Sequence, residues 1–224
     1  MPEAINRILP VNKPIGISTY DVIRLFKRKT GYVGKIGHGG TLDPFASGVV
    51  LLLLGNTTSR FEEIKTWTKR YLAGIRLGAT STTLDITGVI TEHAGGLASA
   101  LSKKDVEQTV AGFTGRFVQK IPAYSAAKHD GVPLYRLARR GIEITKSKTV
   151  LIQSIQVVSF QPPIMTCRVT CGGGVYIRQL AQDIGEKLGS GGFLYHLVRE
   201  QVGDYLLRDC LDVEDFTTSS IPSS

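Results

Sequence analysis

The sequence predicts a mixed fold of the α/β (α+β) class. An apolar run at residues 49–54, closed by Gly55, is typical of a strand that is buried on both faces. Residues 69–78 alternate between apolar and polar side chains, as expected for a half-buried strand. Helical segments lie between the strands, but without the regular alternation of a repeated βαβ fold. We therefore expect a central sheet with helices around it.

Composition bounds the function before any motif is considered. The 224 residues suffice for one domain, or for a domain with a small appendage, and 42% hydrophobic and 21% charged residues are ordinary for a globular protein. The net charge of +8 suits a polyanionic partner such as nucleic acid. No apolar run approaches the roughly 20 residues that cross a membrane, and no signal pattern begins the chain, so we expect a cytoplasmic protein. Three cysteines without a Cys-x-x-Cys pair indicate neither a disulfide framework nor a structural zinc site.

The first expected element is a helix that begins at Ser18 or Thr19 and ends at Gly31. The basic residues at 27–29 fall in its last turn, where they either complement the helix dipole or contact RNA. Further helices are expected over residues 61–67, 103–111, 133–140 and 177–188, and further strands over residues 150–160, 165–171 and 193–202.

A glycine-rich loop at residues 34–48 connects this helix to the apolar strand, and we expect no regular structure in it. Its five glycines permit positive φ angles and close approach of another molecule. The loop carries one imidazole, His38, and one carboxylate, Asp43, which precedes Pro44. A loop that continues into a core strand is held at one end, which suits a catalytic group. An Asp-Pro pair that only starts a turn is the alternative, and the loop lacks the Gly-Lys-Ser/Thr ending of a phosphate-binding loop.

Residues 37–49, Gly-His-Gly-Gly-Thr-Leu-Asp-Pro-Phe-Ala-Ser-Gly-Val, resemble the Gly-His-Thr-Gly-Thr-Leu-Asp-Pro-Leu-Ala-Thr-Gly-Val signature of the bacterial tRNA pseudouridine-55 synthases, the TruB family. Gly39 stands where the family usually has a small hydroxyl residue, and Val198 stands where it often has arginine. The resemblance extends in the family's order from about Lys13 to Leu211. Its other segments are residues 13–16, 69–71, 121–131, 171–178 and 197–199.

The resemblance implies a fold, an activity and a partner. The fold would be a mostly antiparallel central sheet in two halves around an RNA-binding cleft, formed by a catalytic domain at residues 1–215 with an RNA-gripping insertion at about 121–149 and a polar tail at 216–224. The enzyme would convert uridine 55 in the tRNA T-loop to pseudouridine after flipping the base out of its stack. Because this isomerisation involves no net redox change or hydrolysis, no cofactor or metal is expected. The expected partner is the T-arm of tRNA, with no protein partner, no membrane and a monomeric enzyme. Many stand-alone members carry a C-terminal PUA domain, and this chain ends about where one would begin.

By the same resemblance, Asp43 is the catalytic carboxylate, either as a nucleophile or as the base of a glycal route. A buried carboxylate needs a partner to remain ionised, and the family pairs it with the arginine that matches Arg178. Tyr71 would stack on the target uracil, and His38 would hold the space that the flipped base leaves. The pocket would be completed by Tyr176 and Leu197. The basic residues expected to contact RNA are Lys13, Lys128, Arg136, Arg139 and Arg140.

Two other functions fit parts of the sequence. A non-catalytic RNA-binding or tRNA-folding protein could share the scaffold, although the joint presence of Asp43, Tyr71 and Arg178 speaks against it. A nucleotide-binding transferase could use the glycine-rich loop, but phosphate-loop and metal-binding carboxylate patterns are missing.

Overall fold

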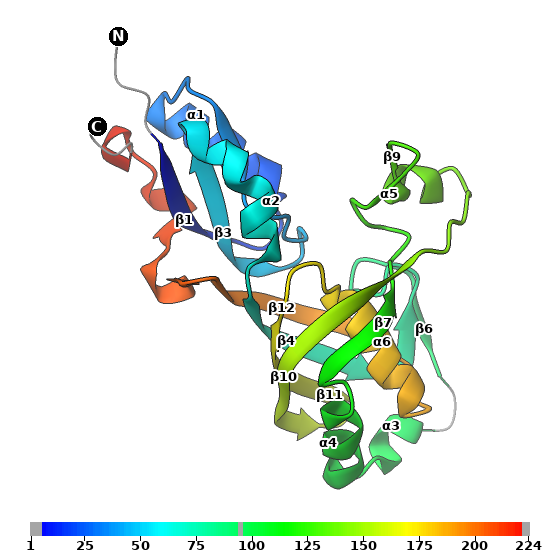
Figure 1. The fold of residues 1–224 in the computed structure, drawn as a ribbon. Helices are drawn as coiled ribbons and strands as arrows, with labels where there is room; N and C mark the ends of the chain where they lie inside the picture. The colour runs from blue at the N-terminus through cyan, green and yellow to red at the C-terminus, as the bar shows by residue number, and fades with distance from the viewer. Residues whose placement is uncertain (1–5, 94–95, 221–224) are drawn as a thin grey trace. The chain divides into compact units, whose positions relative to one another are not determined.

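The computed structural model describes residues 6–93 and 96–220. The chain forms two compact units, one built from Met1–Tyr71 with Leu197–Ser224 and the other from Leu72–His196 (Figure 1). We call them the first and the second unit and describe each by itself. Strands β4 (Lys69–Leu77) and β12 (Gly192–Val202) contribute residues to both. No helix in the described part of the chain is both long and apolar enough to cross a membrane.

The first unit is built on a mixed sheet with the strand order β14-β1-β3-β12. Strand β1 pairs antiparallel with β3, whereas β14 pairs parallel with β1 and the end of β12 pairs parallel with β3. Two short strands extend it, since β2 pairs with β3 and β13 with β12. The elements of this unit are β1 (Arg7–Lys13), α1 (Thr19–Thr30), β2 (Ile36–His38), β3 (Ser47–Leu54), α2 (Phe61–Thr66), β13 (Tyr205–Leu206) and β14 (Leu211–Asp212).

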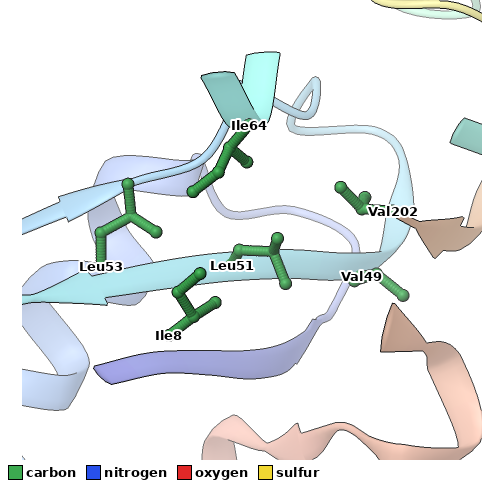
Figure 2. Packing of buried hydrophobic residues seen from close by; sticks show 6 residues of the cluster. All are labelled: Ile8, Val49, Leu51, Leu53, Ile64 and Val202. Carbon is green, nitrogen blue, oxygen red and sulfur yellow. The ribbon is translucent and has the colours of Figure 1, made fainter. Parts of the chain in front are cut away.

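Strand β3 is buried along both faces, as its apolar run predicts. Because side chains alternate between the faces of a strand, Val49, Leu51 and Leu53 share one face, where they pack with Ile8, Ile64 and Val202 (Figure 2). These three partners come from β1, α2 and β12, respectively. The strand that follows the glycine-rich loop is therefore anchored in the core of its unit.

Helix α1 begins and ends where its sequence predicts. The Ser18 side chain accepts a hydrogen bond from the Asp21 N–H (3.1 Å), and the Asp21 carboxylate accepts one from the Ser18 N–H (3.0 Å), which together form a capping box. Gly31 ends the helix in the left-handed region, at a φ of 72°. Of the basic residues in the last turn, Lys29 donates to the carbonyls of Val213 and Glu214 (3.0 and 2.8 Å) and so ties down the chain before the C-terminus.

The C-terminal segment packs on the same helix. Phe216 is buried with its ring edge-on to Phe26, at 5.3 Å between ring centroids. The expected polar tail, residues 216–224, thus begins with a core side chain, and its residues 221–224 lie outside the described part of the chain.

The glycine-rich loop differs from its prediction at one end. Residues 36–38 form β2, which pairs antiparallel with the far end of β3, with His38 opposite Leu52. The prediction of a wholly irregular segment was therefore wrong here, because the backbone groups find partners on a strand that follows later in the chain. From Gly39 to Ala46 the loop is irregular, as predicted.

The second unit has the strand order β4-β11-β10-β7, and β10 pairs antiparallel with both β11 and β7. Helices α4 and α6 contact each other, and they contact β10 and β7, respectively. Two hairpins, β5–β6 and β8–β9, stand apart from this sheet. The elements of this unit are β5 (Ala79–Ser81), β6 (Ile90–Glu92), α3 (Leu97–Ala100), α4 (Lys103–Ala111), β7 (Gly115–Lys120), β8 (Lys128–His129), β9 (Val132–Pro133), α5 (Leu134–Ala138), β10 (Ser147–Gln161), β11 (Ile164–Cys171) and α6 (Ile177–Lys187).

Residues 121–146 form an excursion between two neighbouring strands. They leave the end of β7 and return at the start of β10, where Lys120 is paired with Ser147. The Ile121 N–H also donates to the Lys146 carbonyl (2.8 Å), which closes the neck of the excursion. Beyond the neck, the chain forms the β8–β9 hairpin and the short helix α5 (Figure 1).

Candidate active site

The loop that carries Asp43 is fixed by hydrogen bonds along its whole length. The Gly39 N–H donates to the Leu51 carbonyl of β3 (2.8 Å), and the Ala46 N–H closes a turn onto the Asp43 carbonyl (3.1 Å). The Gly40 N–H donates to Nδ1 of His38 (3.3 Å). The loop is irregular in conformation, but hydrogen bonds anchor its backbone at several positions.

The N-terminal end of α1 holds the two residues that flank Asp43. The Thr19 hydroxyl accepts from the Leu42 N–H (2.9 Å) and donates to the Leu42 carbonyl (3.1 Å). The Gly16 N–H donates to the Pro44 carbonyl (2.8 Å). The capped helix thus fixes the backbone on either side of the carboxylate.

Arg199 anchors the loop residues that precede Asp43, and no pattern in the sequence indicated this role. Its guanidinium is buried and donates to the carbonyls of Val49 (2.6 Å), Thr41 (3.0 Å) and Gly40 (3.4 Å). Arg199 reaches the loop because β12 pairs parallel with β3, with Arg199 opposite Gly48. The strands approach so closely there that a β-carbon at Gly48, which has a φ of 112°, would overlap the Arg199 carbonyl.

Lys13 was expected to contact RNA, but the structure buries its side chain completely. Its ammonium donates to the carbonyls of Pro14 and Ile17 (both 2.8 Å) and of Pro44 (3.4 Å), so it cross-links the turn before α1 to the residue after Asp43. Burial lowers the pKa of Lys13 to about 8, the charge of Arg199 acts in the same direction, and attraction by Asp43 opposes both. Lys13 is therefore a structural cation of the loop, and its buried side chain is not exposed for contact with RNA.

His38 is a partly buried imidazole at the start of the same loop. Its ring lies edge-on to Phe61, at 6.4 Å between centroids. Burial, and then the charge of Arg199, lower the pKa of His38 below its usual value of 6.5, so the ring is neutral at pH 7. Because Nδ1 accepts the Gly40 N–H, the neutral ring carries its proton on Nε2.

The first unit therefore collects most of the expected catalytic pocket. Two buried cations bind backbone carbonyls on either side of Asp43 in the sequence, Arg199 at Thr41 and Lys13 at Pro44. Tyr71 and Leu197 are buried in the same unit, on β4 and β12, respectively. A carboxylate in this setting has fixed backbone geometry and a positive local field, which suits a nucleophile or a base.

In the second unit, Arg178 lies in the first turn of α6 and is nearly buried. Its guanidinium donates to the carbonyls of Thr83 (3.1 Å) and Tyr124 (2.9 Å) and lies 3.4 Å from the carboxylate of Asp85. The other oxygen of Asp85 accepts hydrogen bonds from both the N–H and the hydroxyl of Thr87 (2.9 and 2.5 Å) and from the hydroxyl of Thr83 (2.7 Å).

Asp85 is a site residue that sequence reasoning missed. It is buried beside a turn in which Leu84 has a φ of 64°. The sequence does contain a signal, because Asp85 lies among threonines at 82, 83 and 87. Such a composition usually indicates a solvated turn, so it does not single out a buried carboxylate. Asp43 belongs to the first unit and Arg178 to the second, and the pairing of these two stays a prediction.

Tyr176 precedes α6 and is fixed by its backbone. Its N–H donates to the Gln119 side chain (2.9 Å), and the Gln119 amide donates back to the Tyr176 carbonyl (3.1 Å). The Lys148 ammonium lies 4.3 Å from the centroid of the Tyr176 ring, at cation–π distance. Nearby residues of this unit line an open hollow of about 400 Å³, which involves residues 82–84, 120–124 and 143–146 and two glutamines of α6, Gln179 and Gln182.

The remaining basic residues predicted to contact RNA lie in the excursion at residues 121–146 and are exposed: Lys128, Arg136, Arg139 and Arg140. Two of them, Arg136 and Arg139, lie over the ring of Tyr135, at 6.0 and 5.6 Å from its centroid. The excursion thus presents cations and an aromatic ring together. Among the described residues, no group of three or more histidine, cysteine or acidic side chains could hold a metal ion.

A known protein family matches a large part of the sequence. The model described as "TruB family pseudouridylate synthase (N terminal domain)" matches residues 25–177, which include the Asp43 loop, Tyr71 and Asp85. The chain belongs to the TruB family. The family that the motifs resembled is thereby confirmed.

Relatives in this family cover most of the chain. It is 39% identical over 213 residues to the tRNA pseudouridine synthase B of Dehalococcoides mccartyi, an alignment that covers 93% of this chain and 69% of the relative. It is 41% identical over 219 residues to the tRNA pseudouridine synthase B of Bacteroides thetaiotaomicron, with coverage of 93% and 90%.

Solved structures confirm the expected pseudouridine synthase fold. The match to a Cbf5-Nop10-Gar1 complex has a TM-score of 0.70 at 24% identity, and the match to an H/ACA RNP bound to a substrate RNA containing 2′-deoxyuridine has a TM-score of 0.69 at 22% identity. Both matches cover 93% of this chain, which spans about half of the matched chains (52% and 51%).

Proposed function

We propose that this protein is a cytoplasmic, monomeric tRNA pseudouridine synthase that isomerises uridine 55 in the T-loop. Membership of the TruB family supports uridine isomerisation as the reaction, and the names of the relatives support tRNA as the substrate. The observation that supports catalysis by this chain is the hydrogen-bonded loop that carries Asp43, because two buried cations, Arg199 and Lys13, bind its carbonyls before and after this residue. A protein that only bound or folded RNA would not need a carboxylate held in this way.

The reaction breaks the C1′–N1 glycosidic bond, turns the uracil and joins C1′ to C5, which then loses its proton. Asp43 either attacks C1′ as a nucleophile or removes a ribose proton in a glycal route. Both routes need its ionised form, and the hydrogen bonds that hold Leu42 and Pro44 restrict the positions that the carboxylate can take. Tyr71 would stack on the uracil, and Tyr176 and Leu197 would close its pocket.

The RNA must present its uridine outside the base stack. Flipping costs a few kcal/mol, and least in a loop that is already strained, so contacts that replace the lost stacking recover part of the cost. His38 would fill the space left by the base, and its neutral ring with a proton on Nε2 would offer one donor there. The cations of the excursion, including Lys128, Arg136, Arg139 and Arg140, would bind T-arm phosphates.

The deciding experiment sequences pseudouridine in unmodified tRNA after treatment with the purified protein. We expect pseudouridine at position 55, with release of tritium from 5-³H-uridine tRNA, no added cofactor and full turnover in EDTA on prefolded RNA. The Asp43→Asn variant keeps size and hydrogen bonding but removes the charge, so it should still bind tRNA and form no product. Turnover by Asp43→Asn at a near-normal rate would refute the role of this carboxylate.

Comparing an isolated T-arm stem–loop with whole tRNA as substrates tests whether the enzyme recognises the T-arm alone. We expect the stem–loop to react nearly as well as whole tRNA, and its binding should weaken steeply with salt as phosphate contacts are lost. An inert stem–loop beside a reactive tRNA would contradict recognition of the T-arm alone.

A further inference from the structure

Helix α1 displays an aromatic side chain to solvent beside the Asp43 loop. Tyr20 is 57% exposed, whereas tyrosine is on average of intermediate burial. The guanidinium of Arg24, one turn later, lies over this ring at 4.8 Å from the centroid. Residues four apart share a helix face, so the two side chains form one exposed platform.

Basic residues continue this platform along the helix. Arg24, Lys27 and Arg28 are all exposed and follow Tyr20 at spacings of four, seven and eight residues, which keep them on one face. The acidic residue of α1 itself, Asp21, is engaged by the Ser18 hydroxyl (2.6 Å) and by Arg24 (3.2 Å). The exposed face therefore carries a net positive charge with an aromatic ring at one end.

The aromatic end of this face adjoins the loop of the candidate site. Thr19, next to Tyr20, is hydrogen-bonded to Leu42, and Gly16 is hydrogen-bonded to Pro44. A polynucleotide that delivers a base to Asp43 would thus pass the N-terminal end of α1.

We propose that Tyr20 stacks on an unpaired nucleotide of the RNA substrate while Arg24, Lys27 and Arg28 bind the phosphates that lead away from it. This inference rests on the proposed function, because it concerns the same RNA. Arg24 covers one face of the ring, and the base stacks on the opposite face. Base–aromatic stacking tolerates any base, and adjacent cations track the phosphate backbone, which is the usual design of a single-strand contact.

The test measures equilibrium binding of a T-arm stem–loop that already contains pseudouridine, so that turnover does not interfere. Tyr20→Ala should weaken binding at least about fivefold, as expected for one lost stacking contact. Tyr20→Phe keeps the ring and should bind within about twofold of the wild type. Val33→Ala removes a side chain that is 95% exposed beyond the other end of α1 and serves as the matched surface control.

A second experiment measures binding as a function of salt concentration. Lys27→Ala and Arg28→Ala should each reduce the slope of log Kd against log salt by about one phosphate contact, whereas Tyr20→Ala should leave the slope unchanged. Wild-type affinity in Tyr20→Ala would overturn the proposal, and so would an equal loss in Tyr20→Phe, because stacking requires the ring and not the hydroxyl. Pseudouridine formation by the wild type is measured in parallel. Its absence would refute the proposed function, whereas normal formation with no effect of Tyr20→Ala would refute the platform alone.

Discussion

Replacement of Arg199 by methionine tests whether the loop depends on its buried cation. The substitution removes three hydrogen bonds to carbonyls, of which those to Val49 and Thr41 are short (2.6 and 3.0 Å). Hydrogen bonds that involve a charged group contribute about 1.5–3 kcal/mol each, so the two short ones amount to about 3–6 kcal/mol. Part of this is offset because a buried charge no longer has to be desolvated. We expect the free energy of unfolding in urea to fall by about 2–4 kcal/mol.

Activity should fall further than stability alone explains. Without Arg199 the loop loses its anchor at Gly40 and Thr41, and a misplacement of about 1 Å near a reacting group costs about 100-fold in rate. Single-turnover pseudouridine formation at saturating tRNA, measured at a temperature where the variant is folded, should fall by that factor, while the Kd for tRNA changes little. Arg199→Lys should be intermediate, because an ammonium keeps the charge but not the planar fork.

An independent readout comes from His38. The charge of Arg199 is the second cause that lowers its pKa, after burial, so Arg199→Met should raise the His38 pKa toward 6.5 in an NMR titration. A variant with wild-type stability, single-turnover rate and His38 titration would refute the anchoring role of Arg199.

Three further predictions test other parts of the site. The pKa of Lys13 falls from 10.5 in the unfolded state to about 8 in the folded state, so the wild-type free energy of unfolding should rise by up to about 3 kcal/mol between pH 8 and 10.5. The Lys13→Met variant should lack this rise in urea unfolding. Equal pH dependence of the two proteins would contradict the prediction. At Gly39 an added β-carbon would lie 2.7 Å from Cγ2 of Ile64, so Gly39→Ser, which introduces a small hydroxyl residue of the kind usual in the family, should lower the unfolding free energy by about 1–3 kcal/mol. Gly37→Ser is the matched control, because a β-carbon added at Gly37 would lie 3.5 Å from Cγ2 of Thr58, an ordinary van der Waals contact. An equal loss of stability in this control would exclude crowding as the cause. Arg178→Met leaves the buried Asp85 carboxylate without its cation and should lower the free energy of unfolding by about 3–5 kcal/mol. Adding Asp85→Asn should recover part of this loss in a double-mutant cycle, and strict additivity would argue against the ion pair.

What the sequence predicts well is local. The cap at Ser18, the stop at Gly31 and the buried strand at residues 49–54 each follow from a few neighbouring side chains, and the structure has all three. Strand β1 lacks such a signal, because Pro10 in its middle argues against a strand. It forms because β3 pairs with it over its whole length.

Long-range partners are what the sequence does not reveal. Arg199 contacts the Asp43 loop across 158 residues of sequence, through a parallel pairing of β12 with β3 that no local pattern specifies. Asp85 is likewise a partner of Arg178 only in the folded unit. Lys13 was expected at the surface, because a lysine in a Lys-Pro-x-Gly turn is usually solvated. Only the fold shows that its ammonium donates to three carbonyls. Motif resemblance located Asp43 without locating the groups that hold it.

The closed neck of the excursion has a consequence for how this protein can vary. Because the β7–β10 ladder and the bond between Ile121 and Lys146 join its two ends, the chain between them can change length without shifting the sheet register. Doubling a flexible loop adds only about 0.6 kcal/mol of closure entropy. Insertions and deletions among relatives should therefore concentrate at residues 126–145, beyond Tyr124, whose carbonyl binds Arg178. We expect that grafting this segment from another family member would yield a folded protein in which the RNA preference changes and the scaffold does not.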